Sequence, residues 1–285
     1  MELERRADAA IGPTPTDGRH RWLERLARAG YAARGLVYVL IGILAVRAAM
    51  GAGGETTGPR GALREFAEGP FGTAVIALMA IGLAGYALWR VIQGVRDTEG
   101  KGREAKGLWL RAGMIGSGLI HAGWAVLATG LAFGSSSGGG SGGEDAQAQG
   151  WTATLMMQPF GRWMVAALGI GIVVFGINQL RQAWTDRFKQ HVAIDHMRER
   201  TRTAFTAVGR SGLAARGVTF LIAGGFLLTA AWRFDPAEAK GLGGSLAHLL
   251  EQPFGPIMLG VVALGVVAFG LYNAFLARFQ VIRPR

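Results

Sequence analysis

The residue with the clearest potential for chemistry is His121, which lies inside a run of uncharged residues over 112–143. An ionisable side chain in the middle of a hydrophobic helix indicates a proton relay or a ligand contact. Two similar segments of the chain hold Tyr38 and Phe220 at the same position. The alternative is therefore a neutral histidine that fills an aromatic position and makes one hydrogen bond between helices. Both interpretations stay open, and Tyr38 joins His121 as a candidate on a ligand or proton path.

Two arginines begin hydrophobic segments at equivalent positions. Arg34 and Arg216 each stand six residues after an earlier arginine of the same motif, and Ser117 takes this place in the second of the three copies. Such arginines can hold an anionic headgroup or substrate near the mouth of a helix bundle. They can equally be anchors whose long side chains reach the headgroup layer. The serine of the second copy interrupts a ring of three arginines.

A second set of polar residues lies near the ends of three other hydrophobic segments. Arg90, Gln179 and Asn273 share one offset from a repeated proline. They could form a polar ring around an inner vestibule, or they could be ordinary interfacial residues at helix ends. We therefore keep them as ligand-path candidates of the same rank as the two arginines.

Other chemistry finds little support. The hydrophobic segments lack Asp and Glu, so no Ser-His-Asp set can be assembled within them. The chain has no cysteine, which excludes thiolate catalysis and cysteine metal sites. His191 and His196 are five residues apart, which places them on different faces of a helix. We expect no catalytic residue, no metal, no cofactor and hence no enzyme.

The composition is typical of a membrane protein. Of the 285 residues, 50% are hydrophobic and 17% charged, and the apolar residues fall in long blocks. A helix needs about 20 residues to cross a hydrocarbon core about 30 Å thick. Flanking arginines can extend the shorter blocks to that length, so we predict six spanning helices. The runs without Asp, Glu, Lys or Arg are 35–46, 69–89, 112–143, 163–180, 217–232 and 252–277.

Basic residues alternate between the predicted connections. Of the 30 Lys and Arg residues, 24 fall in 1–34, 90–111, 181–216 and the segment after 277. This alternation follows the positive-inside rule and predicts both termini in the cytoplasm of a multi-pass cytoplasmic-membrane protein. The net charge of +11 is then explained by contact with the anionic inner leaflet of the bilayer. A nucleic-acid partner is not needed.

One unit is written three times along the chain. A Pro-Phe-Gly tripeptide precedes a long apolar segment in each copy, and apolar residues at helical spacing precede the tripeptide. We expect a short interfacial helix that ends near the proline, and a spanning helix that begins at the proline. The three copies are Pro70-Phe71-Gly72, Pro159-Phe160-Gly161 and Pro253-Phe254-Gly255.

A stripe of small and aromatic residues follows each tripeptide. Twelve residues after the proline stands a glycine, and sixteen after it an aromatic ring, which steps of four keep on one helix face. Small residues at such positions allow close approach of neighbouring helices, so we expect the glycines to be helix contacts. The glycines are Gly82, Gly171 and Gly265, and the rings are Tyr86, Phe175 and Phe269.

We predict an all-α membrane protein in which three helical hairpins surround a pseudo-threefold axis along the membrane normal. An unstructured tail should cover 1–21, and the second repeat should carry a Gly/Ser insert at 134–143. A basic connector, with Trp184, Phe188 and Val192 spaced by four, should form an amphipathic helix on the inner leaflet. The repeats and the connector are 22–98, 99–182, 183–209 (connector) and 210–280.

The Ala-Arg-Gly start of the odd helices, the Pro-Phe-Gly start of the even ones and their threefold recurrence resemble a bacterial integral-membrane family. It is known as the domain of unknown function 1206. The resemblance covers about 22–279 and implies six helices in three repeats, but no activity. From the residues we expect a non-enzymatic structural, lipid-binding or partner-binding protein. Further partners would be another membrane protein or a second copy. The alternative is a channel or transporter for protons or small solutes along the pseudo-threefold interface.

The charge pattern can be tested with single cysteines, because the natural chain has none. Gly139→Cys and Ala237→Cys should react with a membrane-impermeant maleimide in intact cells, because both positions follow the first spanning helix of a repeat. Glu104→Cys should react only after the membrane is opened. The reverse labelling pattern would overturn the orientation.

Overall fold

Six long helices carry the fold. The computed structural model describes residues 15–52, 56–67, 72–98, 100–133, 144–194 and 197–280. A short helix precedes the second long helix of each repeat, as the sequence predicts. The long helices are α2 (Pro15–Ala49), α4 (Gly72–Arg96), α5 (Ala105–Ala132), α7 (Gly161–Thr185), α8 (Glu199–Arg233) and α10 (Gly255–Phe279). The shorter elements are α3 (Pro59–Ala67), α6 (Glu144–Met156) and α9 (Leu242–Leu250), with the 3-10 turns η1 (Arg187–His191) and η3 (Pro236–Glu238).

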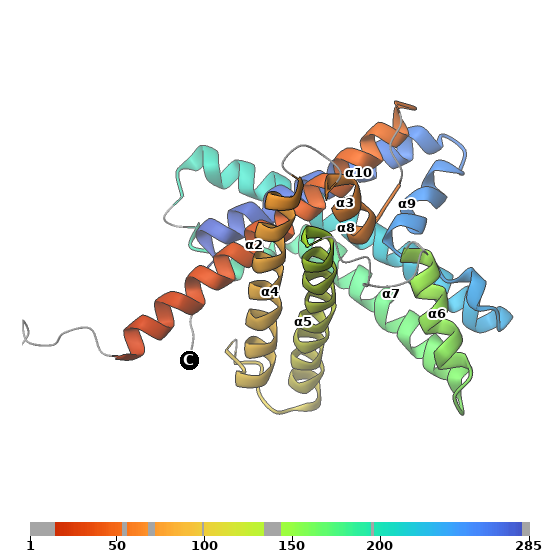
Figure 1. The fold of residues 1–285 in the computed structure, drawn as a ribbon, viewed down its shortest axis with the longest axis horizontal. Helices are drawn as coiled ribbons and strands as arrows, with labels where there is room; N and C mark the ends of the chain where they lie inside the picture. The colour runs from red at the N-terminus through yellow and green to blue at the C-terminus, as the bar shows by residue number, and fades with distance from the viewer. Residues whose placement is uncertain are drawn as a thin grey trace, which may run out of the picture.

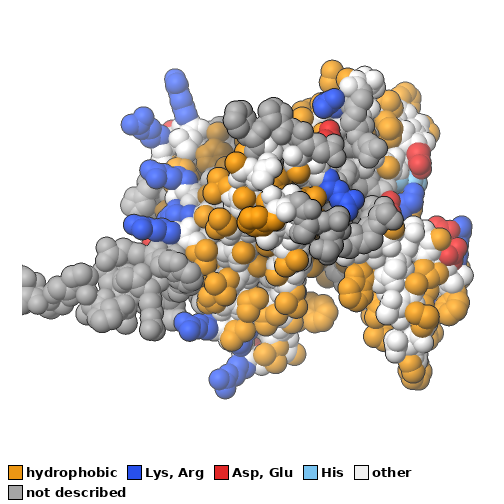
Figure 2. Space-filling model, in the orientation of Figure 1, with side chains coloured by type: hydrophobic (Ala, Val, Ile, Leu, Met, Phe, Trp, Pro, Cys, Tyr) orange, Lys and Arg blue, Asp and Glu red, His pale blue; other side chains and the backbone are white. Residues whose placement is uncertain are grey.

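All six long helices contain a stretch long and apolar enough to cross a membrane. The stretch in α2 starts at Glu24, and in the other five it takes the whole helix. The predicted number of spans and the all-helical fold class are therefore confirmed. Figure 2 shows Lys and Arg side chains at the left and lower edges of the molecule, and hydrophobic side chains over the α4–α5 pair.

The most extensive helix contacts join neighbouring repeats. The pairs are α4 with α5, α7 with α8, and α10 with α2, so the last helix closes on the first. Within the repeats, α2 packs on α4 and α8 packs on α10, whereas α5 and α7 have no comparable contact over their described residues. In Figure 1 the α4–α5 pair runs vertically while α7 runs diagonally away from it. The ring is open at this point, so the pseudo-threefold arrangement is not confirmed.

The three contacts between repeats use the same small residues. A Cβ atom added to Gly35 of α2 would lie 2.7 Å from the carbonyl oxygen of Gly270 of α10. Such close backbone approach requires glycine and is how small residues hold membrane helices together. The equivalent contacts are Gly118 with the carbonyl of Ala87 at 2.9 Å, and Gly217 with that of Gly176 at 3.0 Å.

Contacts within the repeats follow the predicted glycine stripe only in part. A Cβ atom on Gly82 would lie 2.5 Å from Cβ of Ala33, and one on Gly265 would collide with Ala215. The third member, Gly171, has no atom within 4 Å of an added Cβ. The expected helix contact is absent at Gly171 because α5 is not packed against α7.

The Pro-Phe-Gly turns differ from the prediction that the proline opens the helix. α7 and α10 begin at the glycine, and the preceding Phe160 and Phe254 adopt left-handed backbone angles, with φ of 61° and 60°. The N–H of Gly255 donates to the carbonyl of Gln252 at 2.8 Å, which closes a β-turn. The proline presets the second position of this turn. Residues 68–71, with the first Pro-Phe pair, lie outside the described residues.

The glycine of the turn is required by space. A Cβ atom at the last turn residue would collide with a carbonyl oxygen at the end of the preceding short helix. The colliding pairs are Gly161 with Leu155 and Gly255 with Leu250. The chain therefore reverses from the short helix into the long one at a point where only a hydrogen atom fits.

The connector between the second and third repeats is not the amphipathic helix that we predicted. α7 ends at Thr185, because Asp186 takes a left-handed conformation with φ of 55°. Phe188 and Val192 are buried in the core, whereas Trp184 is exposed. Val192 forms an isolated antiparallel bridge with Gln280, so the connector packs against the end of α10.

Asp186 holds the connector to α8. Its carboxylate accepts hydrogen bonds from Arg210 and Lys189, each at 2.8 Å. These bonds, that of Arg210 above all, lower the pKa of Asp186 from its ordinary 3.8 to about 2, against the opposing effect of partial burial. A lowered pKa means that the ion pair contributes stability above pH 3.8 and loses it as the pH falls towards 2.

The N-terminal prediction needs a correction at its boundary. α2 begins at Pro15, so residues 15–21 belong to a helix and not to an unstructured tail. A proline suits the first turn of a helix, where its missing N–H has no partner to lose. Residues 1–14 and the predicted Gly/Ser insert 134–143 lie outside the described residues.

The turn geometry can be tested by a single methyl group. Gly255→Ala should lower the melting temperature of the detergent-solubilised protein, because its Cβ meets a backbone carbonyl that cannot move away. Forced overpacking of this kind costs about 1–3 kcal/mol. Gly260→Ala in the same helix is the control, since its Cβ would lie 3.8 Å from Ala49, an ordinary contact. Equal melting temperatures for the two variants would contradict the crowded turn.

Candidate functional site

Two arginines meet aromatic rings in the interior of the bundle. α10 packs against both α2 and α8, and it places Phe269 between Arg34 and Arg216. The guanidinium carbons of the two arginines lie 5.2 and 4.8 Å from the centre of this ring. We call this group the arginine cluster; its members are Arg34, Arg216, Tyr38, Tyr86, Phe175, Phe220 and Phe269.

Arg34 is buried, with 7% of its surface exposed. Its Nη1 donates a hydrogen bond of 2.6 Å to the hydroxyl of Tyr86. The guanidinium also faces the rings of Tyr86 at 5.0 Å and Tyr38 at 5.6 Å. Aromatic faces attract cations, more strongly where water is excluded. The Nε atom of Arg34 is buried and has no hydrogen-bond partner.

Arg216 is held by rings from all three repeats. Its guanidinium carbon lies 4.8 Å from the centre of Phe220, 5.3 Å from that of Phe175 and 6.0 Å from that of Tyr38. Its Nε is also buried without a hydrogen-bond partner. Two positive charges therefore share one aromatic surrounding.

The charge of the cluster is not balanced by a described carboxylate. Each ion pair among the described residues involves a basic residue other than Arg34 and Arg216. Burying an unpaired charge costs several kcal/mol, and an arginine inside a membrane bundle normally faces a partner or a polar cavity. The arrangement can therefore bind an anion through N–H groups that have no partner within the described chain.

His121 lies beside the cluster. Its ring centre is 4.5 Å from that of Tyr86 and 4.5 Å from that of Trp124. Nδ1 donates to the carbonyl of Ser117 at 2.7 Å, because a carbonyl can only accept. This bond stays within α5 and does not join two helices, contrary to the expectation for a structural histidine. The buried Nε2 has no hydrogen-bond partner.

The predicted polar ring consists of three differently placed residues. Arg90 is half-buried and donates to Gln93 at 3.0 Å. Gln179 and Asn273 are buried, and each has one amide atom without a partner, Nε2 and Oδ1 respectively. The Nδ2 of Asn273 donates to the carbonyl of Phe269, one turn away in α10, at 2.7 Å. Gln179 on α7 and Asn273 on α10 therefore carry polar groups one helical turn from Phe175 and Phe269 of the arginine cluster.

The aromatic part of the cluster is what sequence reasoning missed. Tyr86, Phe175 and Phe269 stand out in the sequence only as a stripe at one offset, which predicts packing. A second pair of aromatic residues, Tyr38 and Phe220, stands four residues after the two arginines. The presence of both aromatic sets was the sequence signal that rings surround the arginines. Only the helix order in space, with α10 between α2 and α8, brings the two stripes around one pair of charges.

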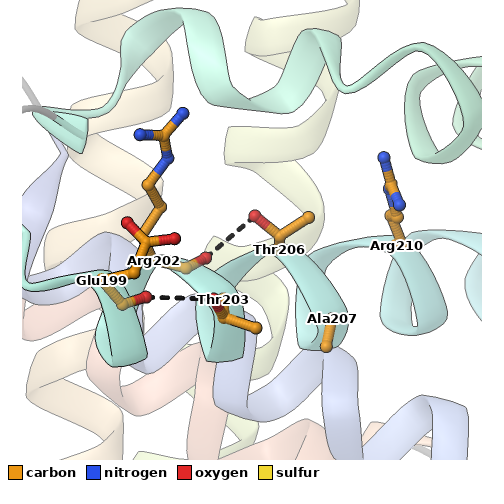
Figure 3. Close-up of a pocket in the computed structure, with 6 residues that line it drawn as sticks. All are labelled: Glu199, Arg202, Thr203, Thr206, Ala207 and Arg210. Atoms are coloured by element: carbon orange, nitrogen blue, oxygen red, sulfur yellow. Dashed lines mark hydrogen bonds between the residues drawn. The ribbon is translucent and has the colours of Figure 1, made fainter.

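A surface recess lies elsewhere, on the first part of α8. Figure 3 shows that its six lining residues belong to this one helix, and that Thr203 and Thr206 bond back to the carbonyls of Glu199 and Arg202. Arg210, at its end, is paired with Asp186. Because its hydroxyls are already used within the helix, the recess is a weaker site than the arginine cluster.

Six membrane-length helices in three repeats, with charged residues enclosed between them, define a multi-pass α-helical membrane protein. The chain belongs to the family described as Domain of Unknown Function (DUF1206), which matches residues 29–97, 112–186 and 211–280, one match to each repeat. It is 35% identical over 259 residues to the uncharacterized protein YxxB of Bacillus subtilis (strain 168), covering 91% of this chain and 92% of that protein. No solved structure matches the chain.

The hydrogen bond within the cluster gives a direct test. Tyr86→Phe keeps the ring but removes the oxygen that accepts from Arg34. Hydrogen bonds to charged groups contribute about 1.5–3 kcal/mol, so the melting temperature in detergent should fall clearly. Tyr272→Phe removes another buried hydroxyl that has no described bond to an arginine, and it should cost less. A larger loss for Tyr272→Phe would contradict the importance of the Arg34 contact.

Proposed function

We propose that this protein is a non-enzymatic protein of the cytoplasmic membrane that binds an anionic phosphate or carboxylate group at the arginine cluster. The observation that carries the proposal is the pair Arg34 and Arg216, enclosed by shared rings without a described carboxylate. Arginine binds such groups through two parallel N–H bonds. An anion would replace the hydrogen bonds to water that each guanidinium loses on burial.

The position of the arginines along their helices favours a ligand from the cytoplasmic side. Arg34 and Arg216 precede the outer ends of their helices, marked by Arg47 and Arg233, by 13 and 17 residues. At 1.5 Å per residue this is about 20–25 Å, so both lie in the half that the charge pattern assigns to the cytoplasm. Anionic lipids are enriched in that leaflet. A lipid headgroup is therefore the first candidate, and a soluble anion the second.

A transport function is the alternative, and one observation favours it. The unpartnered Nε2 of His121 lies next to Tyr86, which bonds to Arg34, so a polar chain runs from α5 to α2. Against it, the long helices lack the mid-membrane break that usually marks a transport site. Transport would appear as anion or proton flux into proteoliposomes that Arg34→Gln abolishes.

The proposal is tested by ligand-dependent stability. Addition of phosphatidylglycerol should raise the melting temperature of the wild type in detergent, whereas phosphatidylcholine should not. Arg34→Gln/Arg216→Gln should lose this shift, because about 1.5–3 kcal/mol per charged hydrogen bond corresponds to about tenfold or more in affinity. Without lipid the variant should be as stable as the wild type or more so, since two uncompensated charges are gone.

Arg47→Gln/Arg233→Gln is the matched control. These two arginines have side chains 52% and 65% exposed, and removing them changes the net charge equally. They should leave the response to phosphatidylglycerol unchanged. Inorganic phosphate in place of the lipid distinguishes a soluble anion from a headgroup. An equal response in wild type and Arg34→Gln/Arg216→Gln would exclude the cluster as the anion site.

A further inference from the structure

In the second repeat, the sides of α5 and α7 that correspond to the packed sides of the other two repeats form an open apolar face. We call it the α5–α7 seam; on α5 it includes Gly116 and Ile120, and on α7 it includes Leu168, Gly171 and Phe175. Ile120, Leu168 and Phe175 are 58%, 48% and 41% exposed. In the space-filling view, a notch separates the lobe of α4–α5 from that of α6–α7 (Figure 2).

The same positions are closed in the other two repeats. Where α5 has Ile120, α2 has Val37 and α8 has Thr219, and both are buried. Where α7 has Phe175, the other repeats have the buried rings of Tyr86 and Phe269. The residues of the seam are therefore of the type that packs against a neighbour. In this repeat the neighbour is not the partner helix.

The glycines confirm that space is present along the seam. An added Cβ would meet backbone or side-chain atoms at Gly82 in the first repeat and at Gly265 in the third. At Gly116 and Gly171, as at Gly113 one turn earlier, it would meet nothing within 4 Å. A chain of atoms can therefore lie between α5 and α7, where two backbones would otherwise touch.

The inner end of the seam reaches the arginine cluster. The ring of Phe175 lies on the seam and is 5.3 Å from the guanidinium carbon of Arg216. Gln179, one turn further along α7, is 4% exposed, and its Nε2 has no partner. On α5 the small Ser117 stands where the other repeats have arginine, so no long side chain blocks this entrance.

We propose that the α5–α7 seam holds the acyl chain of an anionic lipid whose headgroup is bound by Arg34 and Arg216. This inference rests on the proposed anion site and names its ligand as an amphiphile. The charge complements the headgroup, and the exposed apolar side chains of both helices complement the hydrocarbon chain. Each acyl CH₂ group buried between the helices adds to the affinity, which a soluble anion cannot gain.

The seam can be filled without touching the arginines. Gly171→Leu places a branched side chain in the space assigned to the acyl chain, and should reduce retention of phosphatidylglycerol in native mass spectrometry at least tenfold. Gly225→Leu is the matched control, because an added Cβ at Gly225 of α8 also meets nothing within 4 Å. It should retain the lipid like the wild type. Inorganic phosphate should stabilise the wild type far less than phosphatidylglycerol does.

Failure of this inference and failure of the anion site give different results. Equal lipid retention by Gly171→Leu and wild type, with loss in Arg34→Gln/Arg216→Gln, would overturn the seam but keep the anion site. Retention by the arginine variant would overturn both. An equal effect of phosphate and lipid would also overturn the seam.

Two alternatives to a lipid chain remain to be tested. The seam could close, with α5 packed on α7, or a second copy of the protein could occupy it. Spin labels on Leu119→Cys/Ile170→Cys should give a longer distance than labels on the equivalent pair Leu36→Cys/Ile81→Cys of the first repeat, where α2 packs on α4. Equal distances would mean a closed seam and would overturn the proposal. A dimer in light scattering that Gly171→Leu disrupts would assign the seam to a second copy instead.

Discussion

Two guanidinium groups enclosed in an apolar bundle are the constraint on which the rest of the arrangement depends. Charge is expensive in a membrane, and the described part of this chain offers the two arginines no carboxylate. It offers instead aromatic faces on several sides and the phenol oxygens of Tyr86 and Tyr38. To bring those faces together, α10 must lie between α2 and α8. The helix order in space thus follows from the same residues that make the site.

The helix contacts are made by glycine because the rings need the side-chain volume of the interior. At Gly35, Gly118 and Gly217 the backbones of neighbouring repeats touch, which leaves the space on the adjacent faces for aromatic side chains. The second repeat keeps its contacts with the neighbouring repeats, at Gly118 and Gly217. It lacks the contact between its own two long helices. It also has serine in place of the arginine. The second of three similar units is therefore the one whose own two helices are not packed on each other over the described residues.

Much of the fold could be predicted from the sequence, because hydrophobic length and repeat spacing are local properties. The six spans, the short helices before each turn, and the close contacts at Gly82 and Gly265 all follow from residues within one repeat. The left-handed Phe160 and Phe254 could not be predicted, since phenylalanine has no preference for that conformation. Each lies in a turn that is closed by a bond from the following glycine N–H to the carbonyl of Gln158 or Gln252. The prediction of an amphipathic connector helix was wrong because Phe188 is buried against Phe205 and Tyr272, which are distant in the sequence. The arginine cluster depends on which repeat lies beside which, and no local pattern carries that information.

The closure of α10 on α2 has a consequence for how the chain is made. The contacts of α4 with α5 and of α7 with α8 join helices that leave the ribosome in succession. The third contact of this kind joins the first and last helices, and Arg28 of α2 donates to the carbonyl of Ala277 across 249 residues. α2 must therefore remain in the bilayer without the contact of Gly35 with α10 until nearly the whole chain has been synthesised. The contact between α2 and α10 therefore forms in a final step after insertion, when the last helix packs against the first.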